Sequence, residues 1–256
     1  MRLLIVNNGI WHSGAQISTN EFLTLIAGRL EVKVLTCIGG RNLARIPGVE
    51  VYKLPCRNVG VLLVMYLDSI AESLVKWADI VWIATGEFAI APKVKHAKKV
   101  PVAAHLHSYE LICPSMRLCY GLKKPCNDNC SLMKSIDCML KTASEEIRRH
   151  ISSVNRSLAS LIFRTLKMPL YYAEWRKLVG KSLHFIDGFI AASKATWDIH
   201  AKHLPEFKSK PSIVIYNPVT EPLKYIRTNP GEPYGNYLLY ASGPNPVKGP
   251  HLLLEA

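Results

Sequence analysis

Two histidines separated by one residue are the most chemically informative feature of the sequence. His105 and His107 end an apolar run that starts at Pro101, and Tyr109 and Glu110 follow at once. Alternate side chains of a strand share a face, so both imidazoles are predicted to lie on one side of a sheet. We favour hydrogen bonding to a substrate hydroxyl over metal ligation, because Glu110 is the one acidic residue nearby. A purely structural role at a strand end is the alternative.

Five of the seven cysteines lie between Cys113 and Cys138. An odd number in a chain of this length argues against a secreted disulfide framework. The candidate metal ligands are Cys113, Cys119, Cys126 and Cys130. Their spacing includes no C-x-x-C pair and fits a closed tetrahedral zinc site only loosely. Reduced thiols that pack as small apolar groups are therefore favoured over structural zinc.

A glycine-containing loop follows the first apolar run. Gly9 and Gly14 stand on either side of Ser13, and a helical pattern starts at Ala15. Backbone N–H groups at a helix start can approach a phosphate or sugar oxygen, assisted by the helix dipole. The dinucleotide-binding spacing G-x-G-x-x-G is absent. A sugar or phosphate contact and a simple tight turn are both compatible with this loop.

A basic stretch runs from Lys141 to Lys181, with nine Lys and Arg residues against three Glu. Leu, Phe and Trp residues are interleaved with the charges, which is typical of a helix lying at a membrane surface. An ordinary helix with a solvated basic face is the alternative. The formal net charge of +13 favours anionic partners. Nucleic acid is not expected, because no recognised binding motif accompanies the charge.

Short apolar runs alternate with helical patterns along the chain, which predicts an α/β fold with a Rossmann-like, doubly wound parallel sheet. The predicted strands are Arg2–Asn7, Glu31–Cys37, Val49–Leu54, Asp79–Ala84, Pro101–Leu106, Asp187–Ala192 and Ser212–Tyr216. Residues 113–129 break the alternation and predict a cysteine-rich insertion or a long loop. The pattern from Leu140 to His184 predicts two helices separated at Met168–Pro169.

The length of 256 residues and a hydrophobic content of 49% predict a globular protein with a substantial core. The longest apolar run, Val59–Leu67, is far shorter than the ~20 residues of a membrane-spanning helix. The first residues read as a buried strand rather than a secretion signal, so a cytoplasmic location is expected. Residues 221–236 predict a linker, and residues 237–256 predict the first strand and turn of an incomplete second domain.

Five segments resemble, in order, motifs of retaining nucleotide-sugar glycosyltransferases of the family-4 type. His107–Pro114 is similar to "HDYWLICP" of that family, and Ser13–Gln16 to its "GGAE". Ile190–Lys194 is similar to "IAVSE", and Val214–Val219 to "VIPNGV". Leu239–Gly249 is similar to "LYVGRLVPEKG". These enzymes have the GT-B fold of two facing Rossmann-like domains, so the resemblance implies an acceptor-binding domain at 1–220 and the start of a donor-binding domain at 237.

The resemblance also implies roles for individual residues. His107 would face the transferred sugar as the catalytic residue, and Lys248 would neutralise the donor diphosphate as it leaves. The implied substrate-binding residues are Ser13, Gly14, His105, Tyr109, Ser193 and Asn217. Gly243 stands where the family usually has a phosphate-binding arginine, and Lys248 lacks the bidentate fork of that side chain.

We therefore expect a hexosyltransferase that acts from a nucleotide-sugar, with retention, on a lipid-linked or polysaccharide acceptor of the cell envelope. No cofactor is expected for this chemistry. The chain is expected to be an inactive fragment and to associate peripherally with the inner face of the membrane. The alternative is a non-enzymatic basic α/β module that binds anionic lipid or another polyanion.

Overall fold

The computed structural model describes residues 1–7, 14–37, 46–54, 69–85, 88–116, 118–121, 124–127, 130–148, 158–218 and 253–254. The chain divides into two compact units. The first unit comprises Met1–Met116 and Ala173–Thr220, and the second comprises Arg117–Tyr172 and Glu221–Ala256. The predicted linker at 221–236 lies outside the described residues, as does the predicted second domain apart from residues 253–254.

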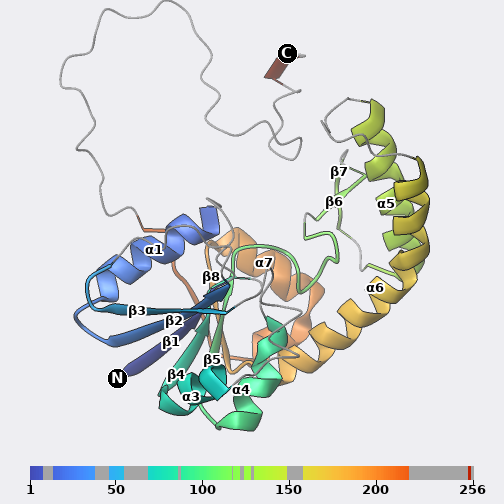
Figure 1. Ribbon diagram of the computed structural model, residues 1–256. Coiled ribbons are helices and arrows are strands. Elements are labelled where there is room, and N and C mark those ends of the chain that lie inside the picture. The colour runs from blue at the N-terminus through green and yellow to red at the C-terminus, as the bar shows by residue number, and fades with distance from the viewer. Residues whose placement is uncertain are drawn as a thin grey trace, which may run out of the picture. The chain divides into compact units, whose positions relative to one another are not determined.

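A seven-stranded parallel sheet forms the centre of the first unit (Figure 1). Its strands are β1 (Arg2–Val6), β2 (Glu31–Cys37), β3 (Val49–Leu54), β4 (Ile80–Ile83), β5 (Val102–Leu106), β8 (Gly188–Ala191) and β9 (Ser212–Val214). The strand order is β3-β2-β1-β4-β5-β8-β9, and each neighbouring pair is parallel. From β1 the chain adds β2 and then β3 on one side. It then returns to add β4, β5, β8 and β9 on the other side of β1. The sheet is therefore Rossmann-like and doubly wound, as predicted, and the seven predicted strands are confirmed within two residues at each end.

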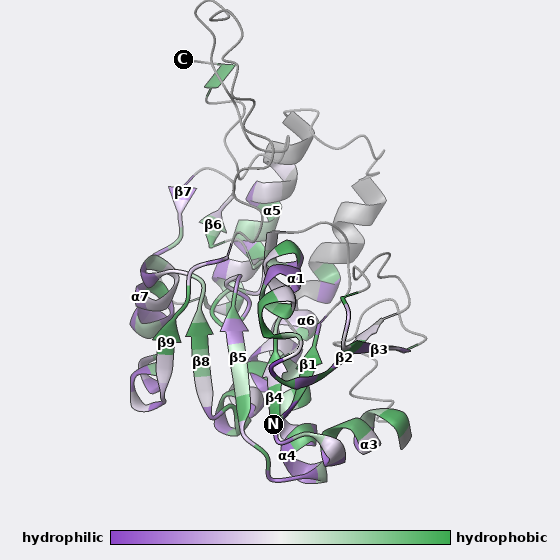
Figure 2. Ribbon diagram, turned by 90° about the vertical axis from the view of Figure 1, so that its left-hand side faces the viewer, coloured by the Kyte–Doolittle hydropathy of each residue, from purple (hydrophilic) through white to green (hydrophobic). Residues whose placement is uncertain are grey.

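Helices cover both faces of this sheet. They are α1 (Gly14–Ile26), α3 (Ser69–Trp77), α4 (Ala91–Ala97), the part of α6 (Leu158–Phe185) that follows Tyr172, and α7 (Lys194–His203), with 3-10 turns η1 (Phe88–Ile90) and η2 (Pro205–Ser209). Leu4 and Val6 of β1 belong to one apolar core, whereas Leu3 and Ile5 belong to a second core with Leu23 of α1. This alternation follows from the two-residue period of a strand. Figure 2 shows mainly apolar colouring along β1, β4 and β8, and mixed polar and apolar colouring along α1 and α7.

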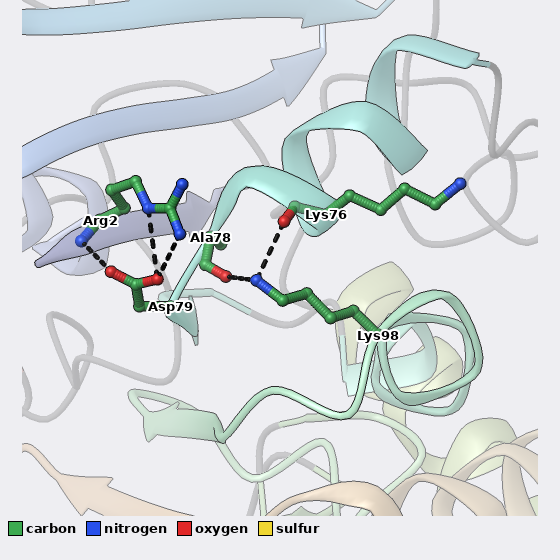
Figure 3. A network of polar contacts seen from close by, with 5 residues as sticks. All are labelled: Arg2, Lys76, Ala78, Asp79 and Lys98. Carbon is green, nitrogen blue, oxygen red and sulfur yellow. Dashed lines mark hydrogen bonds and ion pairs between the residues drawn. The ribbon is translucent and has the colours of Figure 1, made fainter.

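Basic side chains hold the ends of helices and strands in the first unit (Figure 3). Lys98 Nζ donates to the carbonyls of Lys76 and Ala78, at 2.9 and 2.5 Å, where α3 ends. A cation at this position satisfies carbonyls that have no helical partner and complements the helix dipole. Arg2 forms a paired contact with Asp79, whose pKa falls to about 2 chiefly because Arg2 donates hydrogen bonds to it. These contacts fix the amino-terminal ends of β1 and β4.

The second unit contains a β-hairpin and two helical segments. Strands β6 (Cys119–Tyr120) and β7 (Lys124–Pro125) form the hairpin within the predicted insertion, and α5 (Leu132–Arg148) packs against β6. None of the described helices is long and apolar enough to cross a membrane.

The predicted helix break at Met168–Pro169 is wrong, because Pro169 lies inside α6. Two helices are present, as predicted, but α5 begins at Leu132 and α6 at Leu158. A proline inside a helix removes one hydrogen bond at a cost of about 3 kcal/mol. Packing C-terminal to it offsets this cost, since Val179 and Leu183 are buried in the core and the Trp175 indole donates to the Glu110 carbonyl at 2.6 Å.

Candidate functional site

The point where the winding of the sheet reverses lies between β1 and β4, and two polar residues meet there. Thr85, just after β4, donates a hydrogen bond from its hydroxyl to the Asn7 side-chain oxygen at 2.9 Å. Asn7 directly follows β1 and is 1% exposed. Doubly wound sheets bind ligands at this edge. Sequence reasoning missed both residues, although a polar residue ending the first buried strand was an available signal.

His105 of β5 is enclosed by aromatic rings on the α1 side of the sheet. Its ring centroid lies 5.7 Å from that of Phe22 in α1 and 5.7 Å from that of Trp82 in β4. The residue is 1% exposed, and neither ring nitrogen has a hydrogen-bond partner among the described residues. Burial lowers the pKa of His105 to about 3, and a smaller effect comes from His107. The imidazole is therefore neutral at physiological pH and shielded from solvent.

His107 lies against His105, as their shared strand face predicts. The ring centroids are 3.8 Å apart and the ring planes are tilted by 36°. Burial lowers the pKa of His107 to about 4, and its Nε2 atom has no partner among the described residues. A neutral imidazole offers one hydrogen-bond donor and one acceptor. This half-buried ring can therefore bind a hydroxyl group without carrying charge.

The segment after His107 contacts α7. The rings of Tyr109 and His200 are stacked with centroids 5.7 Å apart, and the His200 Nδ1 atom lies 2.8 Å from the Thr196 carbonyl. Burial lowers the pKa of His200, although the hydrogen bond with the Thr196 carbonyl acts to raise it. Burial also raises the pKa of Glu110 to about 7, and Ser108 acts in the opposite direction. Sequence reasoning did not find His200, which has no neighbouring motif to mark it.

Three further predicted residues lie at the ends of secondary-structure elements. Gly14 is the first residue of α1, and Ser193 caps α7 by accepting a hydrogen bond from the Thr196 amide at 3.1 Å. Asn217, beyond β9, accepts a hydrogen bond from the Ser18 hydroxyl of α1 at 2.7 Å. The side-chain oxygens of Ser193 and Asn217 thus have partners within the protein. Ser13 and Lys248 lie outside the described residues.

The four cysteines predicted as possible zinc ligands form no disulfide bond with one another in the described part of the chain. The Cys113 sulfur lies 3.1 Å from the Ser115 hydroxyl in the first unit. Cys119, Cys126 and Cys130 belong to the second unit, where the Cys130 sulfur lies 2.9 Å from the Ser135 hydroxyl. Among the described residues, no group of three or more His, Cys, Asp or Glu side chains is arranged to hold a metal ion.

Comparison with solved structures finds proteins of low sequence identity. HepE of Anabaena, solved in complex with UDP, is 16% identical with a TM-score of 0.48, and the match covers 85% of this chain and 44% of HepE. UGT71G1 of Medicago truncatula, complexed with UDP-glucose, is 12% identical with a TM-score of 0.44, covering 84% and 51%. UGT2 of Phytolacca americana, complexed with UDP-2fluoro-glucose and pterostilbene, is 10% identical with a TM-score of 0.43, covering 84% and 52%.

The chain thus spans about half the length of these solved proteins or less. A comparison of the sequence with models of protein families gives no match, and a comparison with curated proteins gives none either.

Proposed function

We propose that the chain is the acceptor-binding part of a glycosyltransferase. The enzyme moves a hexose from a nucleotide-sugar, with retention, to a lipid-linked or polysaccharide acceptor in cell envelope polysaccharide biosynthesis. The observation that carries this proposal is the pair of neutral imidazoles in contact, His105 and His107, at the carboxyl end of β5 in a doubly wound sheet. The five motif resemblances support the same function.

The chemistry proposed for His107 is hydrogen bonding to a hydroxyl of the transferred sugar. A neutral imidazole suits a hydroxyl, because it can both donate and accept without the desolvation cost of a buried charge. The start of α1 at Gly14 supplies backbone N–H groups for the donor diphosphate, and Lys248 neutralises its developing charge. Tyr109 and Asn217 are proposed to contact the substrates, and no cofactor is required.

We further propose peripheral association with the inner face of the membrane. The exposed residues of α6 in the first unit include Lys177 and Lys181, together with Leu178 and Phe185. Basic and apolar side chains side by side on one helix match the requirements of an anionic lipid surface. Vesicle binding without any transfer reaction would instead favour the non-enzymatic basic module.

The test is a transfer assay on the longest natural form of the protein, with a panel of nucleotide-sugars and the anomeric configuration of the product determined by NMR. The His107→Ala variant should lower kcat/KM by roughly 10²-fold, the scale of a lost transition-state hydrogen bond. The matched control is His96→Ala, which alters an exposed histidine of α4 and should leave kcat/KM unchanged. Failure to transfer from any nucleotide-sugar, or equal activity of both variants, contradicts the proposal.

A further inference from the structure

The two ring nitrogens of His107 lie in different surroundings. The Nε2 atom is buried and has no hydrogen-bond partner in the described part of the chain, whereas the residue as a whole is half-buried. The solvent-exposed part of the ring therefore excludes Nε2. Of the two nitrogens, only Nδ1 is left for a ligand that approaches from solvent.

The contact between His107 and His105 is itself enclosed by protein. The ring centroids are 3.8 Å apart. His105 is 1% exposed, and both of its ring nitrogens are buried without a hydrogen-bond partner among the described side chains and backbone. His105 therefore acts on His107 through ring contact rather than through a hydrogen bond.

Two further rings pack on His105, and they come from different elements. The Trp82 ring of β4 has its centroid 5.7 Å from that of His105 at an interplanar angle of 31°, and the Phe22 ring of α1 lies 5.7 Å away at 61°. Phe22 and Trp82 contact each other edge to face, with centroids 5.8 Å apart. Aromatic pairs in such arrangements attract each other beyond the effect of buried area alone. We name Phe22, Trp82 and His105 the aromatic support of His107.

Ring packing takes the place of the hydrogen bond that usually orients a functional histidine. Such a histidine commonly donates from one ring nitrogen to a carbonyl or a carboxylate, and this bond fixes the tautomer and the ring plane. The buried Nε2 atom of His107 has no such partner among the residues that the structure describes. Close packing of an interior restricts the rotamers of the side chains within it. The aromatic support is therefore the feature that limits the orientation of His107.

We propose that Trp82 and His105 are positioning residues, which hold the His107 ring so that its Nδ1 atom meets a hydroxyl group of the substrate. A neutral imidazole nitrogen either accepts from or donates to a hydroxyl group, depending on the tautomer. Trp82 is 7% exposed and acts on His107 through His105. The inference rests on the proposed glycosyl transfer, and it assigns the hydrogen bond to one atom of His107.

Chemical modification tests the exposed nitrogen without any transfer reaction. Diethyl pyrocarbonate acylates accessible, neutral imidazole nitrogens, and proton–nitrogen NMR of protein labelled at histidine identifies the modified atom. His107 should be modified at Nδ1, and His105 should stay unmodified while the protein is folded. Modification of His107 at Nε2 would overturn the proposal. The same holds if His107 stays unmodified under conditions that modify the exposed His96.

Two substitutions of His107 test the same atom in the transfer assay. In His107→Asn the amide nitrogen and oxygen are bonded to Cγ, as Nδ1 is in histidine. In His107→Gln they are bonded one carbon further out, as Nε2 is. His107→Asn should therefore retain roughly tenfold more kcat/KM than His107→Gln, the scale of one hydrogen bond. Equal losses, or a more active glutamine variant, would contradict the assignment to Nδ1.

Variants of the aromatic support test the positioning role. His105→Ala should lower kcat roughly tenfold and change KM by less than about twofold, because the His107 ring loses its alignment. His105→Phe should restore most of kcat, since it keeps a ring against His107. Trp82→Leu should resemble His105→Ala. The matched control is Trp77→Leu, at a half-buried tryptophan of α3, and it should leave kcat unchanged.

The outcomes separate this inference from the proposed function. Wild-type kcat in both His105→Ala and Trp82→Leu would overturn the positioning role, as would a His105→Phe variant as impaired as His105→Ala. Circular dichroism of each variant checks that the fold is retained. Absence of transfer by the wild type would reject the proposed function and the positioning role with it. Modification at Nδ1 would then show an exposed His107 nitrogen that serves another reaction.

Discussion

The imidazole rings of His105 and His107 lie with their centroids 3.8 Å apart at the carboxyl end of β5. One intervening residue, Leu106, points to the opposite core and is fully buried there. The buried ring of His105 packs against the half-buried ring of His107. The two rings are thus in contact at a tilt, with His105 buried and His107 half-buried.

His105→Phe should preserve the ring contact with His107 and reduce the sensitivity of the protein to acid. The pKa of His105 in the folded protein, about 3, is below its usual value of 6.5. The stability contributed by the neutral ring is therefore present above pH 6.5 and is lost as the pH falls toward 3. As the pH falls from 6.5 to 5, protonation of His105 in the unfolded chain should lower the free energy of unfolding by roughly 2 kcal/mol.

Denaturant unfolding at several pH values checks this prediction. His105→Ala serves as the comparison, because it removes the ring and should cost about 2–4 kcal/mol through the cavity it leaves. An equally steep acid dependence in His105→Phe and the wild type would contradict the assignment.

Glu110→Gln should have the opposite pH dependence. The pKa of Glu110, about 7, is above its usual value of 4.5, because burial disfavours the carboxylate. The corresponding stability is complete below pH 4.5 and is lost as the pH rises through 7. The variant should therefore equal the wild type at pH 4 and exceed it at pH 8, by up to roughly 3 kcal/mol. Thermal unfolding at the two pH values measures the difference, and a constant difference would refute it.

Ser193→Ala should destabilise the protein by about 1 kcal/mol, because it removes the hydroxyl that caps α7. Ser193→Asp should retain most of the stability, since aspartate is also a good N-cap. Chemical denaturation of the two variants provides the measurement. If both variants are as stable as the wild type, the Ser193 cap contributes nothing to stability. The predicted contact with substrate would then be the remaining role for Ser193.

Vesicle binding through α6 should depend on charge. We expect Lys177→Gln with Lys181→Gln to weaken binding to anionic vesicles, and salt to weaken binding of the wild type. The reason is screening, since the Debye length falls from ~10 Å at 0.1 M salt to ~3 Å at 1 M. Sedimentation with vesicles across this salt range is the assay. Equal binding to neutral vesicles would show that apolar insertion alone is responsible.

The strands could be predicted because their signal is local. Each is a short apolar run, and the seven runs from Arg2 to Val214 lie where the sequence places them. The same two-residue period predicted that His105 and His107 share a face. Pro169 shows the limit of local rules, because burial of Val179 and Leu183 keeps α6 continuous through a residue that usually ends a helix.

The sequence by itself therefore determined the parallel α/β sheet, the histidine pair and the basic character of the chain, since each follows from composition or from short-range periodicity. Only the tertiary structure decided which distant residues meet. Tyr109 stacks on His200, Ser18 reaches Asn217, and the hairpin brings Tyr120 to Lys141. Such contacts depend on how helices, strands and loops pack within each unit, and no pattern of neighbouring residues encodes that packing.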